Sequence, residues 1–160
     1  MPTIHLTTFI AAPAERVFDL ARSIDLHRKS MAHTNEQPVA GVTSGLIGMA
    51  QRVTWRAKHL GVWQTLTSEI TAMDPPAYFQ DTMVQGAFRF MKHDHFFQSL
   101  SSGQTEMKDV FCFAVPLPVL GRLAEIVFLR RYMRALLRER NVVVKQIAES
   151  SEWARYLSTP

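Results

Sequence analysis

An alternation of polar and apolar side chains is the feature that most constrains how this chain can fold. In residues 48–59, Val53, Trp55 and Ala57 alternate with arginine, threonine and lysine. Successive side chains of a β-strand point to opposite faces, so the segment is predicted to be a strand with one covered face and one face in water. Further strand-like segments are 62–73, 78–85, 88–98 and 104–115. Because short turns separate them, we expect an antiparallel meander.

The residues before the meander predict one strand and two short helices. Residues 3–11 are rich in threonine, isoleucine and phenylalanine and are predicted to form the strand. Pro13 suits the first turn of a helix, where a missing N–H group costs nothing. A second short helix is expected to end near Ser30. Breaking residues then predict a loop over 31–47.

A long amphipathic helix is expected after the meander. Pro116 and Pro118 should end the last strand, and apolar residues recur at helical spacing from Ile126 to Ile147. A helix of about 30 residues reaches about 45 Å, so it needs a broad surface to lie on, which the meander can supply.

Composition places the chain among globular proteins of one domain. The 160 residues are 47% hydrophobic and 20% charged, which is too apolar for disorder. We expect one domain over residues 1–150 and a short tail over 151–160 that frays unless Trp153 docks it. The lone Cys112 excludes an internal disulfide framework. The N-terminal segment has no basic region followed by an apolar run, so we expect a cytoplasmic protein with no stable membrane insertion.

The net charge of +4 arises in the predicted long helix, because residues 1–117 are balanced and 118–149 hold the excess. Such a segment could meet nucleic acid or an anionic membrane, but the basic stripe lies on a helix whose other face must cover the sheet, so we expect a solvated helix face and no nucleic acid. Residues 120–129 are apolar nearly all round. The loop 31–47, a membrane surface or a second copy could cover them, the last giving a homodimer through residues 120–131.

The order of the predicted elements indicates an α+β helix-grip fold, in which a curved antiparallel β-sheet wraps around a long C-terminal helix and two short helices follow the first strand. The motifs resemble those of the START-related, polyketide-cyclase-like superfamily (SRPBCC), particularly its bacterial ligand-binding members. This resemblance is carried by Ala12-Pro13-Ala14-Glu15-Arg16-Val17-Phe18, Val53-Thr54-Trp55-Arg56-Ala57-Lys58-His59-Leu60-Gly61, Leu66-Thr67-Ser68-Glu69-Ile70, Asp74-Pro75-Pro76, Gly86-Ala87-Phe88, His93-Asp94-His95, Asp109 and Pro116-Leu117. It implies the fold and an internal ligand cavity, but no particular ligand.

Alternation also predicts which side chains face the interior. A turn centred near residues 101–102 sets His93 or His95 opposite Asp109, with Cβ atoms about 4.5–5.5 Å apart. The predicted ligand-binding residues are Trp55, Leu66, Phe79, Asp81, Met83, Met91, His93, His95, Phe97, Asp109, Phe111, Phe113 and Met133. We expect no lysine or arginine among them. This lining suits a small hydrophobic or aromatic molecule; the alternative is that these side chains fill the interior.

The His93-x-His95 pair has three interpretations. Two imidazoles at i and i+2 on a strand can bind zinc if a third ligand converges, for which Asp109 is the nearer candidate and His59 the remoter one. A histidine held by an aspartate can also act as a general acid or base. In the third interpretation, His93, His95 and Asp109 form a hydrogen-bond network that is either structural or contacts a ligand. We favour the network and expect neither metal nor cofactor.

The sequence therefore predicts a ligand-binding domain whose polar anchors are His93, His95 and Asp109. One alternative is a polyketide cyclase or aromatase, a lyase-like enzyme with these residues as candidate catalytic groups. Another is an interaction module that works through the basic, apolar C-terminal helix.

Overall fold

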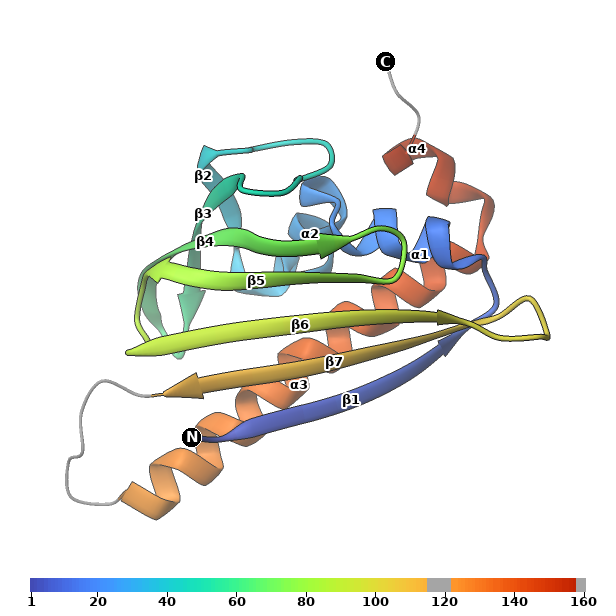
Figure 1. Ribbon diagram of the computed structural model, residues 1–160. Coiled ribbons are helices and arrows are strands. Elements are labelled where there is room, and N and C mark those ends of the chain that lie inside the picture. The colour runs from blue at the N-terminus through green and yellow to red at the C-terminus, as the bar shows by residue number, and fades with distance from the viewer. Residues whose placement is uncertain (115–121, 158–160) are drawn as a thin grey trace.

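A computed structural model describes residues 1–114 and 122–157 of the chain (Figure 1). In chain order its elements are β1 Thr3–Ile10, α1 Ala14–Ala21, α2 Ile24–Ser30, η1 Ala32–Thr34, β2 Gln37–Gly41, β3 Arg52–His59, β4 Val62–Asp74, β5 Tyr78–Gln85, β6 Phe90–Ser99, β7 Thr105–Ala114, α3 Arg122–Glu149, η2 Ser151–Trp153 and α4 Ala154–Leu157.

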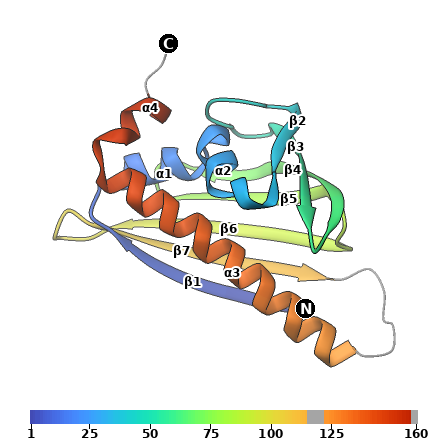
Figure 2. The ribbon, with the colours of Figure 1, turned by 180° about the vertical axis from the view of Figure 1, so that it is seen from behind.

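The strands form one seven-stranded sheet in the order β1-β7-β6-β5-β4-β3-β2, and each neighbouring pair is antiparallel. The sheet curves, and α3 crosses one of its faces, as the view from behind shows (Figure 2). The short helices α1 and α2 lie beside the same face (Figures 1 and 2). This arrangement confirms the predicted α+β helix-grip fold.

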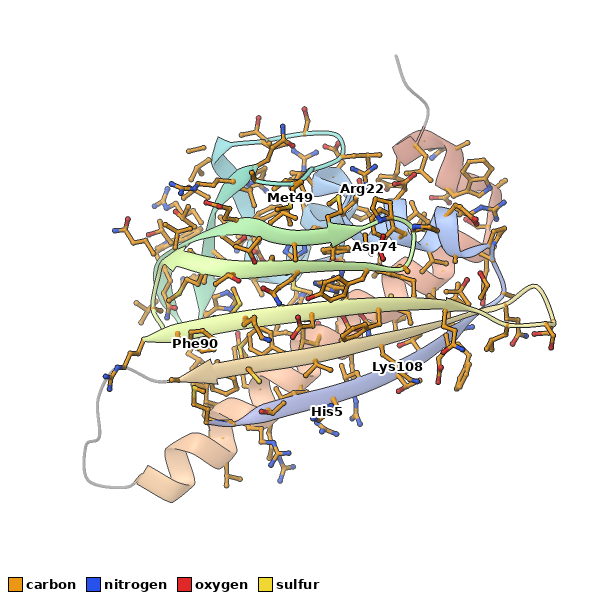
Figure 3. All side chains as sticks on the ribbon, viewed as in Figure 1. His5, Arg22, Met49, Asp74, Phe90 and Lys108 are labelled. Carbon is orange, nitrogen blue, oxygen red and sulfur yellow. The ribbon has the colours of Figure 1, made fainter. Side chains whose placement is uncertain are left out.

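The hairpin between β6 and β7 sets the register that matters most for the site. Gly103 in its turn has a φ of +73°, a left-handed conformation that glycine adopts without strain. The strands pair so that His95 lies opposite Asp109 and His93 opposite Phe111. Side chains then alternate along β7, where the exposed Lys108, labelled in Figure 3, precedes the buried Asp109.

The core at one end of the sheet is built around α1. Phe18 meets the rings of Phe79 and Phe97 edge to face, with centroids 5.7 and 5.5 Å apart. Burial of each phenylalanine ring on folding stabilises the fold by roughly 1.5–3 kcal/mol. The hydroxyl of Ser23 caps α2 by accepting a hydrogen bond from the N–H of Leu26 at 3.3 Å. The ring contacts hold α1 against β5 and β6, and the cap fixes where α2 begins.

The long helix α3 covers the sheet with one apolar face. Its buried hydrophobic residues are Leu136, Leu137, Val144, Ile147 and Ala148. On the same helix Arg140 and Asn141 are also buried, and they reach the polar centre of the molecule. Among the described helices, none has both the length and the hydropathy that a membrane span requires.

One segment differs from the sequence prediction, and a second follows its conditional prediction. The expected loop 31–47 contains the 3-10 turn η1 and the edge strand β2, whose pairing with β3 shifts between Pro38 and Ala40. A proline, which has no N–H group, is compatible with an edge strand. The breaking residues in this segment therefore led to the prediction of a loop where the structure has β2. The tail meets the condition that was stated for its order, because Trp153 packs against the core with the guanidinium of Arg16 4.3 Å from its ring, and residues 151–157 form η2 and α4.

Some predictions fall outside the described residues. Pro116, Leu117 and Pro118 lie there, as does part of the segment 120–131 that was expected to pair two copies. Within that segment Val127 and Phe128 are exposed.

Candidate functional site

A pocket of about 380 Å³ lies between the sheet, α2 and α3. Most of its wall is apolar and comes from strands β3 to β7 and the inner face of α3. The predicted site residues that line it are Trp55, Leu66, Phe79, Asp81, Met91, His93, His95, Phe111 and Met133.

The other predicted site residues do not line this pocket. Phe97 and Phe113 are buried in the hydrophobic core, and the partly buried Met83 packs against one of its clusters. Asp109 is 1% exposed and lies behind the two histidines. Alternation correctly places such residues on the inner face, but it does not separate pocket wall from solid core.

Three adjacent strands bring the histidines and aspartates together. Asp81 of β5 lies opposite His93 of β6, and His95 lies opposite Asp109 of β7. Asp109 Oδ1 accepts a hydrogen bond from His93 Nε2 at 3.0 Å, and Asp81 Oδ1 accepts one from His95 Nε2 at 3.1 Å. The imidazole centroids are 3.7 Å apart, and the ring of Phe79 stacks on His95 at 4.2 Å. The predicted His/Asp cluster is therefore present.

Helix α3 adds two residues to this cluster. Arg140 Nη1 lies 3.3 Å from Asp109 Oδ1, and its Nη2 donates to the carbonyl of Ala21 at 3.1 Å. Asn141 Nδ2 donates to Asp109 Oδ2 at 2.7 Å. The expectation that the lining contains no arginine is wrong, because Arg140 is buried and lines the pocket. A buried carboxylate needs such partners to offset its loss of hydration.

Burial and neighbouring charges set the protonation of the cluster. Burial, with the adjacent His95, lowers the pKa of His93 to about 4, although Asp109 and Asp81 oppose that shift. Burial alone would raise the pKa of Asp109, but the hydrogen bond from His93, the close approach of His95 and the charge of Arg140 hold it well below its usual range. The bond with His95 and the nearby His93 likewise lower the pKa of Asp81 despite its burial. At neutral pH both carboxylates are ionised and His93 is neutral.

The second nitrogen of His95 has an unusual environment. His95 Nδ1 lies 2.9 Å from Asp109 Oδ1, but the angles do not make a hydrogen bond, so this buried atom has no hydrogen-bond partner among the described residues. Asp81, His93 and His95 can also each offer one atom to a common metal ion, since those atoms lie within 4.8 Å of one another.

The pocket wall has a second polar region that was not predicted from the sequence. His59 Nδ1 lies 3.0 Å from the hydroxyl of Tyr132, and His27 Nε2 lies 3.4 Å from Glu36 Oε1. All four residues line the pocket. Their segments meet only in the folded chain, so no local spacing could have indicated them, although His59 lies on the covered face of its predicted strand.

Solved structures with the same fold match this chain over nearly its whole length. Protein TTHA0849 from Thermus thermophilus has a TM-score of 0.71 and 19% identity, covering 93% of this chain and 100% of that one. A START superfamily protein from Mycobacterium smegmatis has a TM-score of 0.69 and 12% identity, with coverage of 92% and 97%. The Zhui aromatase/cyclase from a Streptomyces species has a TM-score of 0.65 and 15% identity, with coverage of 98% and 96%.

No protein-family model matches the chain, and no curated protein matches it significantly. The chain has a START-like, SRPBCC-type fold, as its motifs predict. At these identities the likeness establishes the fold, while chemistry has to be argued from the residues of this chain.

Proposed function

We propose that the protein binds a small hydrophobic or aromatic molecule in this pocket. The observation that carries the proposal is a wall that is mostly apolar and whose paired polar side chains include the His/Asp cluster and the region of His59 and Tyr132. Binding pockets are typically apolar with a few polar groups that fix orientation. The volume of about 380 Å³ lies near the lower end of the usual range of roughly 300–1,000 Å³, so the expected ligand is small.

The His/Asp cluster would orient the ligand by hydrogen bonding. Asp81 is 19% exposed at its side chain, whereas Asp109 is fully enclosed, so Asp81 is the carboxylate that a ligand would reach. Of the two imidazoles, His93 is the more exposed, at 8% of its side chain against 3% for His95. A ligand hydroxyl that donates to an ionised carboxylate contributes about 1.5–3 kcal/mol. We therefore expect an aromatic alcohol to bind more tightly than the parent hydrocarbon.

A paired titration tests the proposal. Isothermal titration with 2-naphthol and with naphthalene should give one site for each, with the alcohol at least about tenfold tighter. The variant Ala57→Phe introduces a ring at a buried position of the pocket wall and should weaken both ligands by at least about tenfold.

The matched control is Val62→Phe, which adds a similar ring to an exposed strand position outside the pocket wall. It should leave both affinities unchanged. Equal binding by Ala57→Phe and wild type, with both variants folded by circular dichroism, would contradict the proposal.

A catalytic role for the same cluster is the second candidate, since two imidazoles in a pocket wall each contact a carboxylate. A general base works best when its pKa is near the working pH. His93, with its pKa lowered to about 4, is a weak base at neutral pH. This argues for a binding role of His93 and leaves His95 as the residue to test for turnover.

A further inference from the structure

We propose that Asp81, His93 and His95 bind a divalent transition-metal ion in the pocket wall. This inference does not depend on the small-molecule ligand, because it concerns the side chains alone. It also revises the choice of third ligand, since Asp109 faces the opposite nitrogen of each ring from the one that faces Asp81.

Each imidazole spans the space between the same two carboxylates. His93 directs Nε2 toward Asp109 Oδ1 at 3.0 Å and Nδ1 toward Asp81 Oδ1 at 3.9 Å. His95 directs Nδ1 toward Asp109 Oδ1 at 2.9 Å and Nε2 toward Asp81 Oδ1 at 3.1 Å. One nitrogen of each ring therefore faces Asp81, and the other faces Asp109.

The three facing atoms fit a metal ion with small adjustments. Asp81, His93 and His95 can each offer one ligand atom, and these three atoms lie within 4.8 Å of one another. Bonds of about 2.0–2.1 Å in a tetrahedral zinc site place neighbouring ligand atoms about 3.3 Å apart. Side-chain rotations that move these atoms by about an ångström complete the site.

Asp109 supplies the supporting contacts that metal-bound histidines need. A histidine that binds metal through one nitrogen usually donates its other N–H to a carboxylate. Asp109 faces that second nitrogen in both rings and is itself fixed by Arg140 and Asn141. With a metal on His95 Nε2, the ring proton sits on Nδ1, and the ring rotation that seats the metal also has to turn this N–H toward Asp109 Oδ1, 2.9 Å away, to give the atom an acceptor.

The charges of the cluster also favour a cation. Among the described side chains, Arg140 gives the cationic contact to Asp109 at 3.3 Å, while Asp81 contacts the imidazoles alone. Two carboxylates against one guanidinium leave a negative charge when both rings are neutral. An ion held by two nitrogens and one oxygen matches zinc or another divalent first-row metal, with a remaining position toward the pocket.

The test is metal titration of chelator-treated protein that has been returned to metal-free buffer. Calorimetry with Zn²⁺ should show one ion per chain, and Co²⁺ should give visible absorption bands typical of nitrogen and oxygen ligands. The variant Asp81→Asn removes a ligand charge without changing side-chain size, and it should weaken Zn²⁺ binding at least tenfold.

The matched control is His33→Gln, because His33 and Glu139 form a comparable His–carboxylate pair at 3.1 Å with both side chains about half exposed. It should leave the Zn²⁺ affinity and stoichiometry unchanged. The Co²⁺ spectrum of wild-type protein provides a readout that needs no variant. The inference would be overturned if wild type bound neither ion stoichiometrically, or if Asp81→Asn left Zn²⁺ binding unchanged. Either result would mean that the cluster binds protons but no metal ion.

Discussion

Asp109 has almost no contact with water, and its two oxygens are shared among four side chains. It accepts from His93 and Asn141, lies against Arg140 and faces the unpartnered nitrogen of His95. Removing one member of a buried charged set typically costs about 3–5 kcal/mol, because the remaining charge is left uncompensated. The cluster is therefore a structural element as well as the polar end of the pocket.

The lowered pKa of His93 predicts that the folded protein loses stability in acid. Its ordinary pKa is 6.5, and burial lowers this to about 4 in the folded state. Below pH 6.5 the unfolded chain takes up a proton that the folded chain accepts only near pH 4, so stability falls as pH falls through this window. The difference corresponds to roughly 3 kcal/mol. The carboxylate of Asp109 keeps its contribution throughout, because its pKa is held well below 3.8.

Urea denaturation between pH 7 and pH 4, with a chelator present, checks this prediction. The free energy of unfolding should decline toward pH 4 in wild type and decline much less in His93→Gln. Parallel pH profiles for the two proteins would show that another group is responsible.

The contact between the His-x-His pair and Asp109 was predicted from the hairpin register, because the turn fixes which residues of the two strands face each other. No such rule predicted Arg140. The periodicity of α3 indicates which residues share a helical face, but not how that face is rotated over the sheet or where a long side chain ends. Asp81 was predicted to face inward, and its position as the outer carboxylate became clear only from the three-strand register.

Helix α3 holds the sheet through its apolar face, while its other face is solvated. Ile147 is 6% exposed and packs in the core beside α1, whereas Val142 on the same helix is 51% exposed. The element was predictable because a 28-residue helix carries its pattern over many turns. The five-residue strand β2 has no room for a pattern, and its Pro38 and Gly41 are typical of loops.

Truncation on the two faces of α3 should separate their contributions. Ile147→Ala leaves a cavity in the core and should lower the free energy of unfolding by about 2–5 kcal/mol. The control Val142→Ala should change it by less than about 0.5 kcal/mol. Chemical denaturation measures both. A cost for Val142→Ala as large as that for Ile147→Ala would mean that the exposed face of α3 is covered in solution.

At the scale of the whole molecule, a curved sheet and one long helix leave a pocket whose wall is drawn from segments far apart in the chain. The fold was predictable from element order and motifs, and the solved structures confirm it. The size of the pocket was not predictable, because it depends on how far Phe97 and Phe113 fill the interior while Phe79 and Phe111 border the space. All four rings obey the same alternation.

The most direct measurement of ligand binding is methyl-labelled NMR with 2-naphthol. Intermolecular nuclear Overhauser effects should connect the aromatic protons to methyl groups of Leu66, Met91 and Met133, which line the pocket. The account would be contradicted if, with the protein saturated by 2-naphthol, the intermolecular nuclear Overhauser effects were confined to exposed methyl groups such as those of Val62 and Val84, or were absent.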